Sequence, residues 1–491
     1  MSRKKQETTP NAARRSRGRP GKASEAKPEP LTFNLVNLGC PKNLVDSERI
    51  MGALAVDGFV YQEDPGEADV CIVNTCGFLG EARDEAREVL RELKTLRGKG
   101  DRPRIVALGC LVERVGGNPG LSEFLAPADA AVGFADYHRL PEICRSLCAG
   151  GGAARAGVTG ARGYGGRTLP ESYVRWLNGP AWRFSSPVTA WLKLGEGCSN
   201  HCAYCSIPLI RGDRVSRPES DVLHDARQLI DSGVREICLC AQDTTAYGMD
   251  REGDKGRFTD LLGRLLELEG DVYWRVLYAH PLHLTKELLR LMASNPRVCP
   301  YIDLPLQHLD SGVLGAMQRG YSFEYARRRL TWIRDIMPEA AIRTTFIVGH
   351  PGEGEEEFER LRVFVKEGRF DHVGVFAWSP EPGTRSARLQ LETARPAEAE
   401  RRKKSLMRAQ AEVAHQKWKK RLGLVTPVFL EAPVPKCHGG STWTAHTLWQ
   451  APDGIDGDCF VKGYPVDAAP TVLQARITEV EPHGCTAEIV E

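Results

Sequence analysis

Short apolar runs alternate with stretches of helical periodicity from Phe33 onward. The runs FNLVNLG, DVCIVNTC and RIVALGC are each followed by residues whose apolar positions recur every three or four places, as in GEARDEAREVLRELKTL. This alternation predicts βα units and a parallel sheet, with ligands expected at the carboxyl ends of its strands. A fourth run, ADAAVGF, ends this predicted domain, residues 31–148.

A second alternating series begins at Val188, after a Gly- and Arg-rich stretch, residues 149–187, that predicts a linker with little structure of its own. Its apolar runs are TAWLKLG, EICLCAQ, VYWRVLYAH, PYIDLPLQH, IRTTFIVGH and HVGVFAWS. Six such units within residues 188–394 predict an incomplete (β/α) barrel, whose chemistry belongs at the carboxyl ends of the strands.

The end of the chain changes character again. Residues 395–422 have the pattern of a basic amphipathic helix, and VTPVFLEA, CFVKGYPV and LQARITEVE in residues 423–491 read as strands of a small β-barrel. The predicted fold class is therefore α/β, with a parallel-sheet α/β domain, an incomplete (β/α) barrel and a small C-terminal β-barrel.

Composition places the chain in a reducing compartment. Its 491 residues suggest about three domains, and no apolar run reaches the roughly 18 residues that span a membrane. Fifteen cysteines occur in a chain whose basic N-terminus is not followed by a secretory signal. Such cysteines are expected to serve as ligands or redox groups rather than as disulfides, so the cytoplasm is the predicted location and no membrane partner is expected.

Charge is unevenly distributed along the chain. Residues 1–30 carry nine Lys or Arg and three Glu, so 9 − 3 = +6, which together with their low apolar content predicts a disordered basic arm. Residues 424–491 carry three Lys or Arg and nine Asp or Glu, so 3 − 9 = −6. Three of these acids, Asp453, Asp456 and Asp458, fall in a turn-rich loop that is expected to present carboxylates to solvent.

The stretch GCSNHCAYC places Cys198, Cys202 and Cys205 at a C-x3-C-x2-C spacing. Three thiolates cannot complete the four-cysteine site of a structural zinc or of an ordinary iron–sulfur cluster, so one coordination position must come from elsewhere. If the metal is a four-iron four-sulfur cluster, one iron stays open to a small molecule. The alternative is three incidental buried cysteines.

A second triple consists of Cys40, Cys76 and Cys110, each of which stands directly after an apolar run and before a helical pattern. Parallel strands would deliver these three thiols to the same edge of one sheet. Three independent buried thiols remain the alternative, and Cys71, inside a predicted strand, is expected to be a core residue.

The first triple, placed after the first strand of an incomplete barrel, resembles the radical S-adenosylmethionine (SAM) superfamily. With the second triple and the terminal β-domain, residues 31–491 resemble the methylthiotransferases, which join a methylthiotransferase domain, a radical SAM barrel and a TRAM domain. The resemblance implies two 4Fe-4S clusters, one on each triple, and SAM as radical source and methyl donor. The first cluster would cleave SAM to a 5′-deoxyadenosyl radical, and the second would hold or donate sulfur.

Two substrate classes are known in this family, namely tRNA adenosines in the MiaB group and an aspartate of small-subunit ribosomal protein S twelve in the RimO group. The segments LGCPKNLVDSE, AQDTTAYG and DLPLQH are similar to the RimO group, whereas MiaB-like chains usually read GCQMN and GQNVNAYG. We therefore expect β-methylthiolation of an aspartate, with tRNA methylthiolation as the alternative. An iron–sulfur RNA-binding or scaffold protein without turnover is a third reading.

The expected partners follow from that assignment and from charge. They are ribosomal protein S twelve, free or on the ribosome, together with an electron donor and a sulfur donor. A terminal domain with a net charge of −6 suits a basic ribosomal protein better than the phosphates of tRNA. Departures from the family pattern are SNH between Cys198 and Cys202, and His350 where an aromatic residue is usual.

The resemblance also assigns SAM contacts to residues at strand ends. The candidates are Gln242, Gln307, Arg343, Thr345 and Gly349. Arginine forms charge-assisted hydrogen bonds with carboxylates, so Arg343 is assigned to the methionyl end, with a surface arginine as the alternative. Backbone around Gly349 would approach the adenosine.

Other polar residues near strand ends have less specific roles. His280, His308 and His372 lack a second ligand at helical spacing, so they are expected to be structural. Arg211 either binds substrate or pairs with Asp213.

Overall fold

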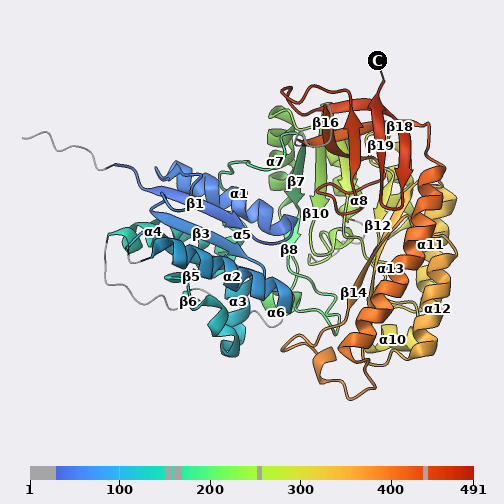
Figure 1. Cartoon of the computed structure of the whole chain (residues 1–491), viewed down its shortest axis with the longest axis horizontal. Coiled ribbons are helices and arrows are strands. Elements are labelled where there is room, and N and C mark those ends of the chain that lie inside the picture. Colours follow the sequence, from blue (N-terminus) through green and yellow to red (C-terminus); the bar gives the residue numbers. More distant parts are fainter. Residues whose placement is uncertain are drawn as a thin grey trace, which may run out of the picture. The chain divides into compact units, whose positions relative to one another are not determined.

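The computed structural model describes residues 29–98, 100–149, 158–159, 168–251, 257–434 and 441–490. The basic arm predicted for residues 1–30 lies outside the described residues except for its last two. The described residues from Leu31 onward belong to one compact unit, shown in Figure 1.

The N-terminal domain is a parallel sheet with helices on both faces. Its strands, in order across the sheet, are β2 (Val60–Tyr61), β1 (Thr32–Asn37), β3 (Val70–Thr75), β4 (Arg104–Gly109), β5 (Ala130–Val132) and β6 (Val158–Thr159). Its helices are α1 (Pro41–Val56), α2 (Gly80–Arg97), α3 (Cys110–Gly117), α4 (Leu140–Cys148) and α5 (Glu171–Trp176), with 3-10 turns at Pro119–Leu125 and Phe134–Arg139.

Alternation along β3 divides the core of this domain into two layers. Val70 and Ile72 pack with residues of α1, α4 and α5, whereas Cys71 and Val73 pack with α2 and α3. Successive side chains of a strand point to opposite faces, so a strand covered on both faces reads as a continuous apolar run. Cys71 is fully buried, as expected of a core residue.

Part of the predicted linker is structured. Of residues 149–187, the described part contains β6, which pairs with β5 as a sixth parallel strand, and α5. Tyr173 of α5 is fully buried and its hydroxyl donates to Asp46 of α1 at 3.0 Å. The linker prediction rested on the Gly- and Arg-rich composition and overlooked a short apolar pattern with helical spacing. Its residues Leu169, Tyr173 and Leu177 belong to the N-terminal core.

The central domain is the incomplete barrel that the sequence predicted. Its six parallel strands are β7 (Thr189–Lys193), β10 (Glu236–Cys240), β11 (Tyr273–Val276), β12 (Tyr301–Asp303), β13 (Ala341–Val348) and β14 (His372–Ala377). They form two three-stranded sheets, which meet where Trp274 pairs with Val298 just before β12. The ladder ends at β7 and β14.

Helices cover the outside of this barrel. They are α7 (Glu219–Asp231), α8 (Arg257–Leu266), α9 (Lys286–Ser294), α10 (Ser311–Ala316), α11 (Phe323–Ile336) and α12 (Glu355–Lys366). Short elements between β7 and α7 are β8 (Gly195–Glu196), α6 (Ile207–Arg211) and β9 (Val215–Ser216), and 3-10 turns occupy Thr244–Ala246 and Ser386–Arg388. Within the ranges given above, no helix combines the length and apolar character needed to cross a bilayer.

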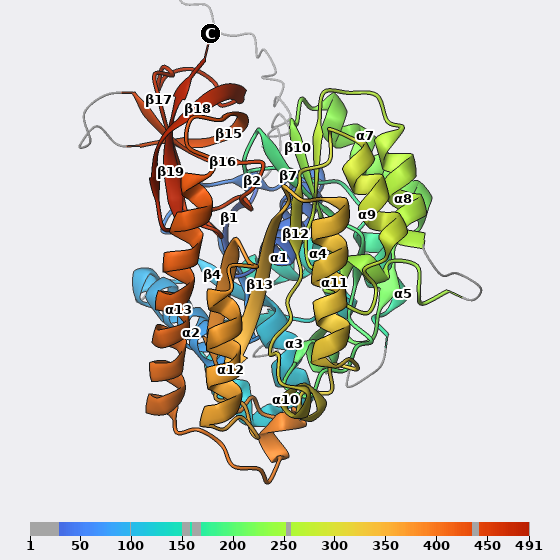
Figure 2. The same ribbon diagram turned by 90° about the vertical axis from the view of Figure 1, so that its right-hand side faces the viewer.

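Helix α13 (Pro396–Lys419) connects the barrel to the C-terminal domain, and Figure 2 shows it alongside α12. The C-terminal domain is a closed barrel in the order β15 (Val425–Pro433), β16 (Thr442–Thr447), β17 (Cys459–Lys462), β19 (Gly484–Ile489) and β18 (Val472–Glu481). Strands β16 and β19 were missing from the sequence prediction, because TWTAHT and GCTAEI are short and most of their buried apolar residues are small: Ala445, Cys485 and Ala487, beside one large residue, Trp443.

Residues from both neighbouring domains fill the inside of the central barrel. Trp191, Cys238 and Tyr301 from its strands form one buried cluster with Val45 of α1 and Ala451, which follows β16. The barrel is therefore filled partly by the N-terminal domain and partly by the C-terminal one.

Candidate functional site

The loop that carries Cys198, Cys202 and Cys205 follows β8 and is fixed by backbone hydrogen bonds. Cys198 N donates to Gly212 O at 3.0 Å, and Cys205 N donates to Cys202 O at 3.0 Å. Gly197 adopts φ +70°, and a side chain there would collide with the carbonyl oxygen of Asp213, so only glycine fits before the first cysteine. All three thiols are free and partly accessible.

Donors surround the sulfur atoms of this loop. Arg319 Nη1 donates to Cys202 Sγ at 3.2 Å, and Ile207 N donates to Cys205 Sγ at 3.4 Å. Burial raises the pKa of Cys198 to about 11. A thiol with a raised pKa stays protonated at neutral pH unless a metal ion displaces the proton. The three thiols and the N–H donors around them therefore fit an iron–sulfur group, whose iron ions would bind the sulfur atoms.

Cys40, Cys76 and Cys110 meet at one edge of the N-terminal sheet. Cys40 caps the start of α1, Cys76 follows β3 directly, and Cys110 is the first residue of α3 after β4. A Cβ placed on Gly39 would lie 3.4 Å from the Cys76 Cβ, and one on Gly77 would lie 2.8 Å from the carbonyl carbon of Cys110. The three strands thus bring the three predicted thiols together.

Arg211, the last residue of α6, contacts the second cysteine triple within a buried ion network. Its Nε donates to Cys110 Sγ at 3.4 Å and its Nη1 donates to Glu196 at 2.7 Å. It also pairs with Asp46 at 3.1 Å. The pair with Asp213, one of the two alternatives that the sequence left open, does not form. Burial raises the pKa of Glu196, but Arg211 and Lys193 lower it to about 2, so the carboxylate is charged.

Charges also shape the chemistry of Cys40. Its side chain is open to solvent, yet protein surrounds it closely enough for burial to raise the pKa of the thiol. The charges of Lys42 and Arg211 and the backbone N–H groups of Asn43 and Lys42 outweigh burial and bring this pKa below its usual value. A helix N-terminus favours a thiolate in this way.

Lys42, at the start of α1, is a buried lysine that faces the barrel. Its ammonium lies 3.0 Å from the centroid of the Tyr278 ring, a cation–π contact. Tyr278 follows β11 with φ +60°, and its backbone N donates to Asp303 at 3.0 Å. A bulky residue rarely adopts positive φ, and such strain is concentrated at functional sites.

A cavity of about 390 Å³ lies beside the Cys198–Cys205 loop. Its lining includes Tyr204 from that loop, Phe78 from the N-terminal domain, and the predicted SAM contacts Gln307 and Thr345. Two of the five predicted contacts thus share one cavity next to the first cysteine triple.

The other three predicted contacts lie elsewhere. Gln242 donates to Glu196 at 3.1 Å, within the Arg211 network. Arg343 pairs with Asp303 at 3.0 Å and Asp456 at 3.1 Å, so carboxylates of the protein already occupy its guanidinium. Gly349 packs against α13 rather than lining the 390 Å³ cavity.

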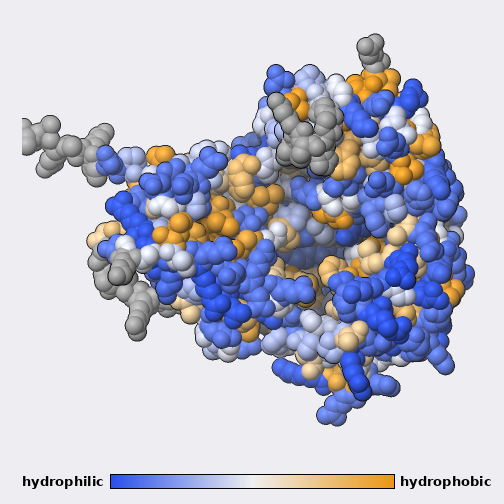
Figure 3. All heavy atoms as spheres, viewed as in Figure 1, coloured by the Kyte–Doolittle hydropathy of each residue, from blue (hydrophilic) through white to orange (hydrophobic). Residues whose placement is uncertain are grey.

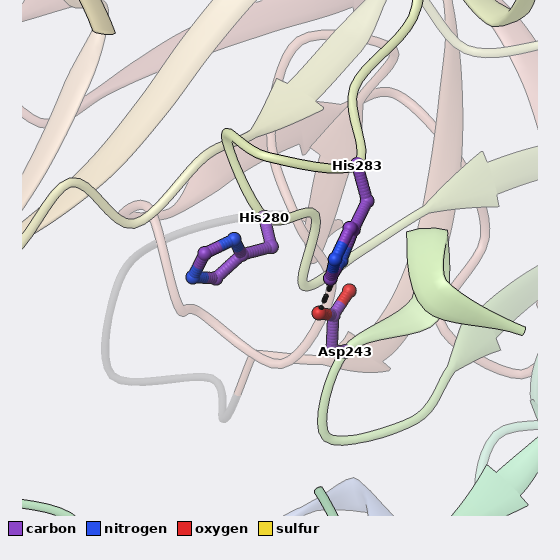
Figure 4. A group of neighbouring side chains, drawn as sticks. All are labelled: Asp243, His280 and His283. Atoms are coloured by element: carbon purple, nitrogen blue, oxygen red, sulfur yellow. Dashed lines mark hydrogen bonds and ion pairs between the residues drawn. The ribbon is translucent and has the colours of Figure 1, made fainter. Parts of the chain in front are cut away.

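Asp243, His280 and His283 form a compact group in which the ligand atoms lie within 4.8 Å of one another (Figure 4). The Asp243 carboxylate accepts from Asn200 of the cysteine loop at 2.7 Å and contacts His283 Nδ1 at 2.8 Å. Burial lowers the pKa of His280 well below its usual value, so this ring is neutral. These contacts anchor the Cys198–Cys205 loop to the end of β10.

The remaining candidate histidines each have a defined neighbour. His308 Nε2 lies 3.2 Å from Glu353, and His372 Nε2 lies 2.8 Å from Trp449 O. His350, which departs from the family pattern, lies 2.8 Å from Ser386 Oγ, and its ring packs edge-on against Tyr204. Burial lowers the pKa of His350 to about 4, so it is a neutral aromatic ring beside the cysteine loop at neutral pH.

Sequence reasoning missed two residues that touch this site. Lys42 stands inside the quoted segment LGCPKN, where the cysteine alone drew attention. Arg319 is far from every motif in the sequence, and only the fold brings it to Cys202.

Comparisons with known proteins cover nearly the whole chain. The Radical SAM superfamily model matches residues 192–365, and the model of the uncharacterized protein family UPF0004 matches residues 32–129. A protein of Akkermansia muciniphila named "Ribosomal protein uS12 methylthiotransferase RimO" is 37% identical over 479 residues, covering 94% of this chain and 100% of that protein. A protein of the same name from Synechococcus sp. is 39% identical over 473 residues, covering 95% and 91%.

Solved structures agree with the fold. The radical S-adenosylmethionine methyltransferase TsrM from Kitasatospora setae superimposes with a TM-score of 0.51 at 15% identity, over 70% of this chain and 72% of that chain. At so low an identity the likeness concerns the fold alone.

Proposed function

We propose that this chain, which belongs to the RimO family of radical SAM methylthiotransferases, attaches a methylthio group to the β-carbon of an aspartate in ribosomal protein uS12. The observation that carries the proposal is the pair of cysteine triples, one on the loop after β8 and one at the edge of the N-terminal sheet, where Arg211 of the barrel donates to Cys110. An unactivated carbon–hydrogen bond cannot be opened by a positioned base, so the reaction requires a radical.

The cofactors follow from family membership and from the thiols. A radical SAM enzyme uses SAM and one 4Fe-4S cluster, for which Cys198, Cys202 and Cys205 are the proposed ligands. We assign a second 4Fe-4S cluster to Cys40, Cys76 and Cys110. When bound, the first group supplies the electron that cleaves SAM to a radical, and the second supplies the sulfur.

The protein's own residues orient these groups. Arg319 and the backbone of Ile207 hold the sulfur atoms of the first triple, and Arg211 holds Cys110 of the second. Donors to ligand sulfurs set the reduction potential of iron–sulfur groups. Gln307 and Thr345 are the preferred SAM contacts because they line the cavity beside Tyr204. Gln242, Arg343 and Gly349 remain proposed contacts that would need their present neighbours to rearrange.

The partners are proposed from charge and chemistry. The acidic C-terminal domain suits a basic ribosomal protein, free or on the assembled ribosome. An electron donor and a sulfur donor complete the reaction, and the free thiols of the described residues suit the reducing cytoplasm.

Mass spectrometry of cells lacking this chain tests the proposal. We expect uS12 without its methylthio group and tRNA adenosines unchanged, with modification restored by the wild-type chain but not by Cys76→Ala. Unmodified tRNA together with normally modified uS12 would contradict the proposal and favour the tRNA activity.

A further inference from the structure

Among the described residues, the buried lysines and arginines are paired with carboxylates in all cases but two, Arg319 and Lys42. Among the described residues, the buried lysines and arginines with a carboxylate partner are Arg49, Arg83, Arg114, Lys193, Arg211, Arg217, Arg275, Arg402 and Arg421. Arg319 has no carboxylate, but donates to Cys202, to Pro305 O and to Tyr321. A buried charge is costly unless it is paired and hydrogen-bonded, so this pairing is what stability requires.

Lys42 differs from all of these described cations in having no acceptor. It is only 7% exposed, and its ammonium has no hydrogen bond or ion pair with any other described residue. The contact with the Tyr278 ring leaves the three N–H donors without acceptors. The groups in its electrostatic surroundings that can carry negative charge are the thiols of Cys40 and Cys240 and the carboxylate of Asp303. Asp303 is already held by Arg343 and by the Tyr278 N–H.

The position of Lys42 adds to its cost. It lies in the first turn of α1, where the helix dipole disfavours a cation. The backbone of Tyr278, with its positive φ, places the Tyr278 ring against the Lys42 ammonium and so fixes the position of that ammonium. Solvent reaches Cys40, two residues away, and Figure 3 shows the surface hollowed between the N-terminal domain and the barrel.

We infer that Lys42 receives the side-chain carboxylate of the substrate. This inference rests on the proposed function, which makes the substrate residue an aspartate. The β-carbon that gains sulfur is one bond from the carboxyl carbon, so the residue that holds the carboxylate also fixes the reacting atom. Lys42 is two residues from Cys40, one of the proposed ligands of the sulfur-carrying group. A free ammonium there selects an anionic side chain and places its β-carbon next to the sulfur source.

The competing explanation is that Lys42 only balances the negative charge of an iron–sulfur group. The two roles differ in one measurable respect, because a counter-charge would not distinguish an aspartate from an asparagine in the substrate.

Peptide binding to the full-length, anaerobically purified protein separates the two roles. The probes are a synthetic uS12 peptide spanning the modified aspartate and the same peptide with asparagine there, with SAM present and no reductant, so that no turnover occurs. We expect the wild type to prefer the aspartate peptide about 10- to 100-fold, the range of a charge-assisted hydrogen bond. Lys42→Met should abolish this preference, while Lys94→Met, on the exposed face of α2, should keep it. Iron content should be unchanged in both.

A second measurement needs no variant. A carbodiimide activates the substrate carboxylate, and attack by a lysine amine then forms an amide bond while the carbodiimide leaves as a urea. Mass spectrometry of the wild-type protein should locate this cross-link at Lys42. A cross-link only at another lysine, or an aspartate preference that persists in a folded Lys42→Met, overturns the inference but leaves the proposed function intact. If wild-type protein modifies neither the peptide nor unmodified ribosomes, the proposed function itself fails.

Discussion

The central barrel contacts the C-terminal domain on one side and the N-terminal domain on another, and the two contacts differ in how their charges are matched. On the C-terminal side, Asp456 enters between Arg343 and Tyr301, and Arg275 pairs with Glu236 at 2.7 Å. Each of these charged groups has a partner among the described residues. Asp456 is therefore a buried structural residue and not, as its turn-rich sequence suggested, a carboxylate presented to solvent.

On the N-terminal side the matching is incomplete. Arg211 and Lys193 satisfy Asp46 and Glu196, and Arg211 also donates to Cys110. Cys40, however, is open to solvent, and the Lys42 ammonium has no hydrogen bond or ion pair with another described residue. A buried network in which every charge is paired holds domains together. A network that contains an unpaired charge leaves that charge available to bind a ligand. We therefore propose that the chemistry takes place on the N-terminal side of the barrel.

The largest expected effects come from the cysteine triples. Changing Cys198, Cys202 and Cys205 together to Ala should leave about four irons per chain and abolish formation of 5′-deoxyadenosine from SAM. Retention of nearly eight irons would contradict the barrel site.

The same replacement at Cys40, Cys76 and Cys110 should spare SAM cleavage but abolish the methylthio product. Product analysis after reduction with dithionite checks both variants. Loss of SAM cleavage in this second variant would contradict separate roles for the two triples.

The next largest effect concerns stability. Asp456→Ala should lower the free energy of unfolding by about 2–4 kcal/mol, because it breaks a buried pair and leaves the Tyr301 hydroxyl without its acceptor. Lys42→Met should leave it unchanged or raise it, since an unmatched buried charge is replaced by an apolar side chain. Urea unfolding of both variants checks the contrast, and equal destabilisation would remove the distinction between the two contacts.

A smaller effect is expected from pH. Burial lowers the pKa of His446, but Glu236 and Glu431 outweigh it and raise this pKa above its usual value. A histidine whose pKa is raised on folding contributes its full stabilisation when the pH is below its pKa in the unfolded chain, about 6.5. This contribution is lost as the pH rises through its pKa in the folded protein. The melting temperature should therefore fall at alkaline pH by an amount that His446→Gln lacks. Identical pH profiles for the two proteins would show that this histidine does not tie the C-terminal barrel to β10.

The smallest effect provides a reference outside both contacts. Gly263 lies within α8, and a Cβ there would meet no atom within 4 Å. Gly263→Ala should stabilise the protein by about 0.5–1 kcal/mol and leave methylthiolation unchanged. Thermal unfolding and product yield check it, and a change in yield would mean that stability alone influences turnover.

Local sequence patterns predicted most helices and strands and the grouping of the cysteines into two triples. Apolar periodicity and short spacings can be read from residues that are close together in the sequence. The loop from Cys198 to Cys205 is a local motif, and the meeting of Cys40, Cys76 and Cys110 followed from the parallel sheet. Pairings across domains could not be predicted in this way. Arg319 reaches Cys202 across 117 positions, and Arg343 reaches Asp456 across 113, so their partners depend on tertiary packing.

The contact between Arg211 and Cys110 has a consequence for how the protein is made. Cys40, Cys76 and Cys110 leave the ribosome well before the barrel, yet the surroundings of Cys110 are incomplete until Arg211 follows 101 positions later. By the same measure, the surroundings of Cys202 are incomplete until Arg319, which follows Arg211 by 319 − 211 = 108 positions. At roughly 5–20 residues per second this delay is about 5–20 seconds. The two triples of the nascent chain would then become complete in order, the N-terminal one first.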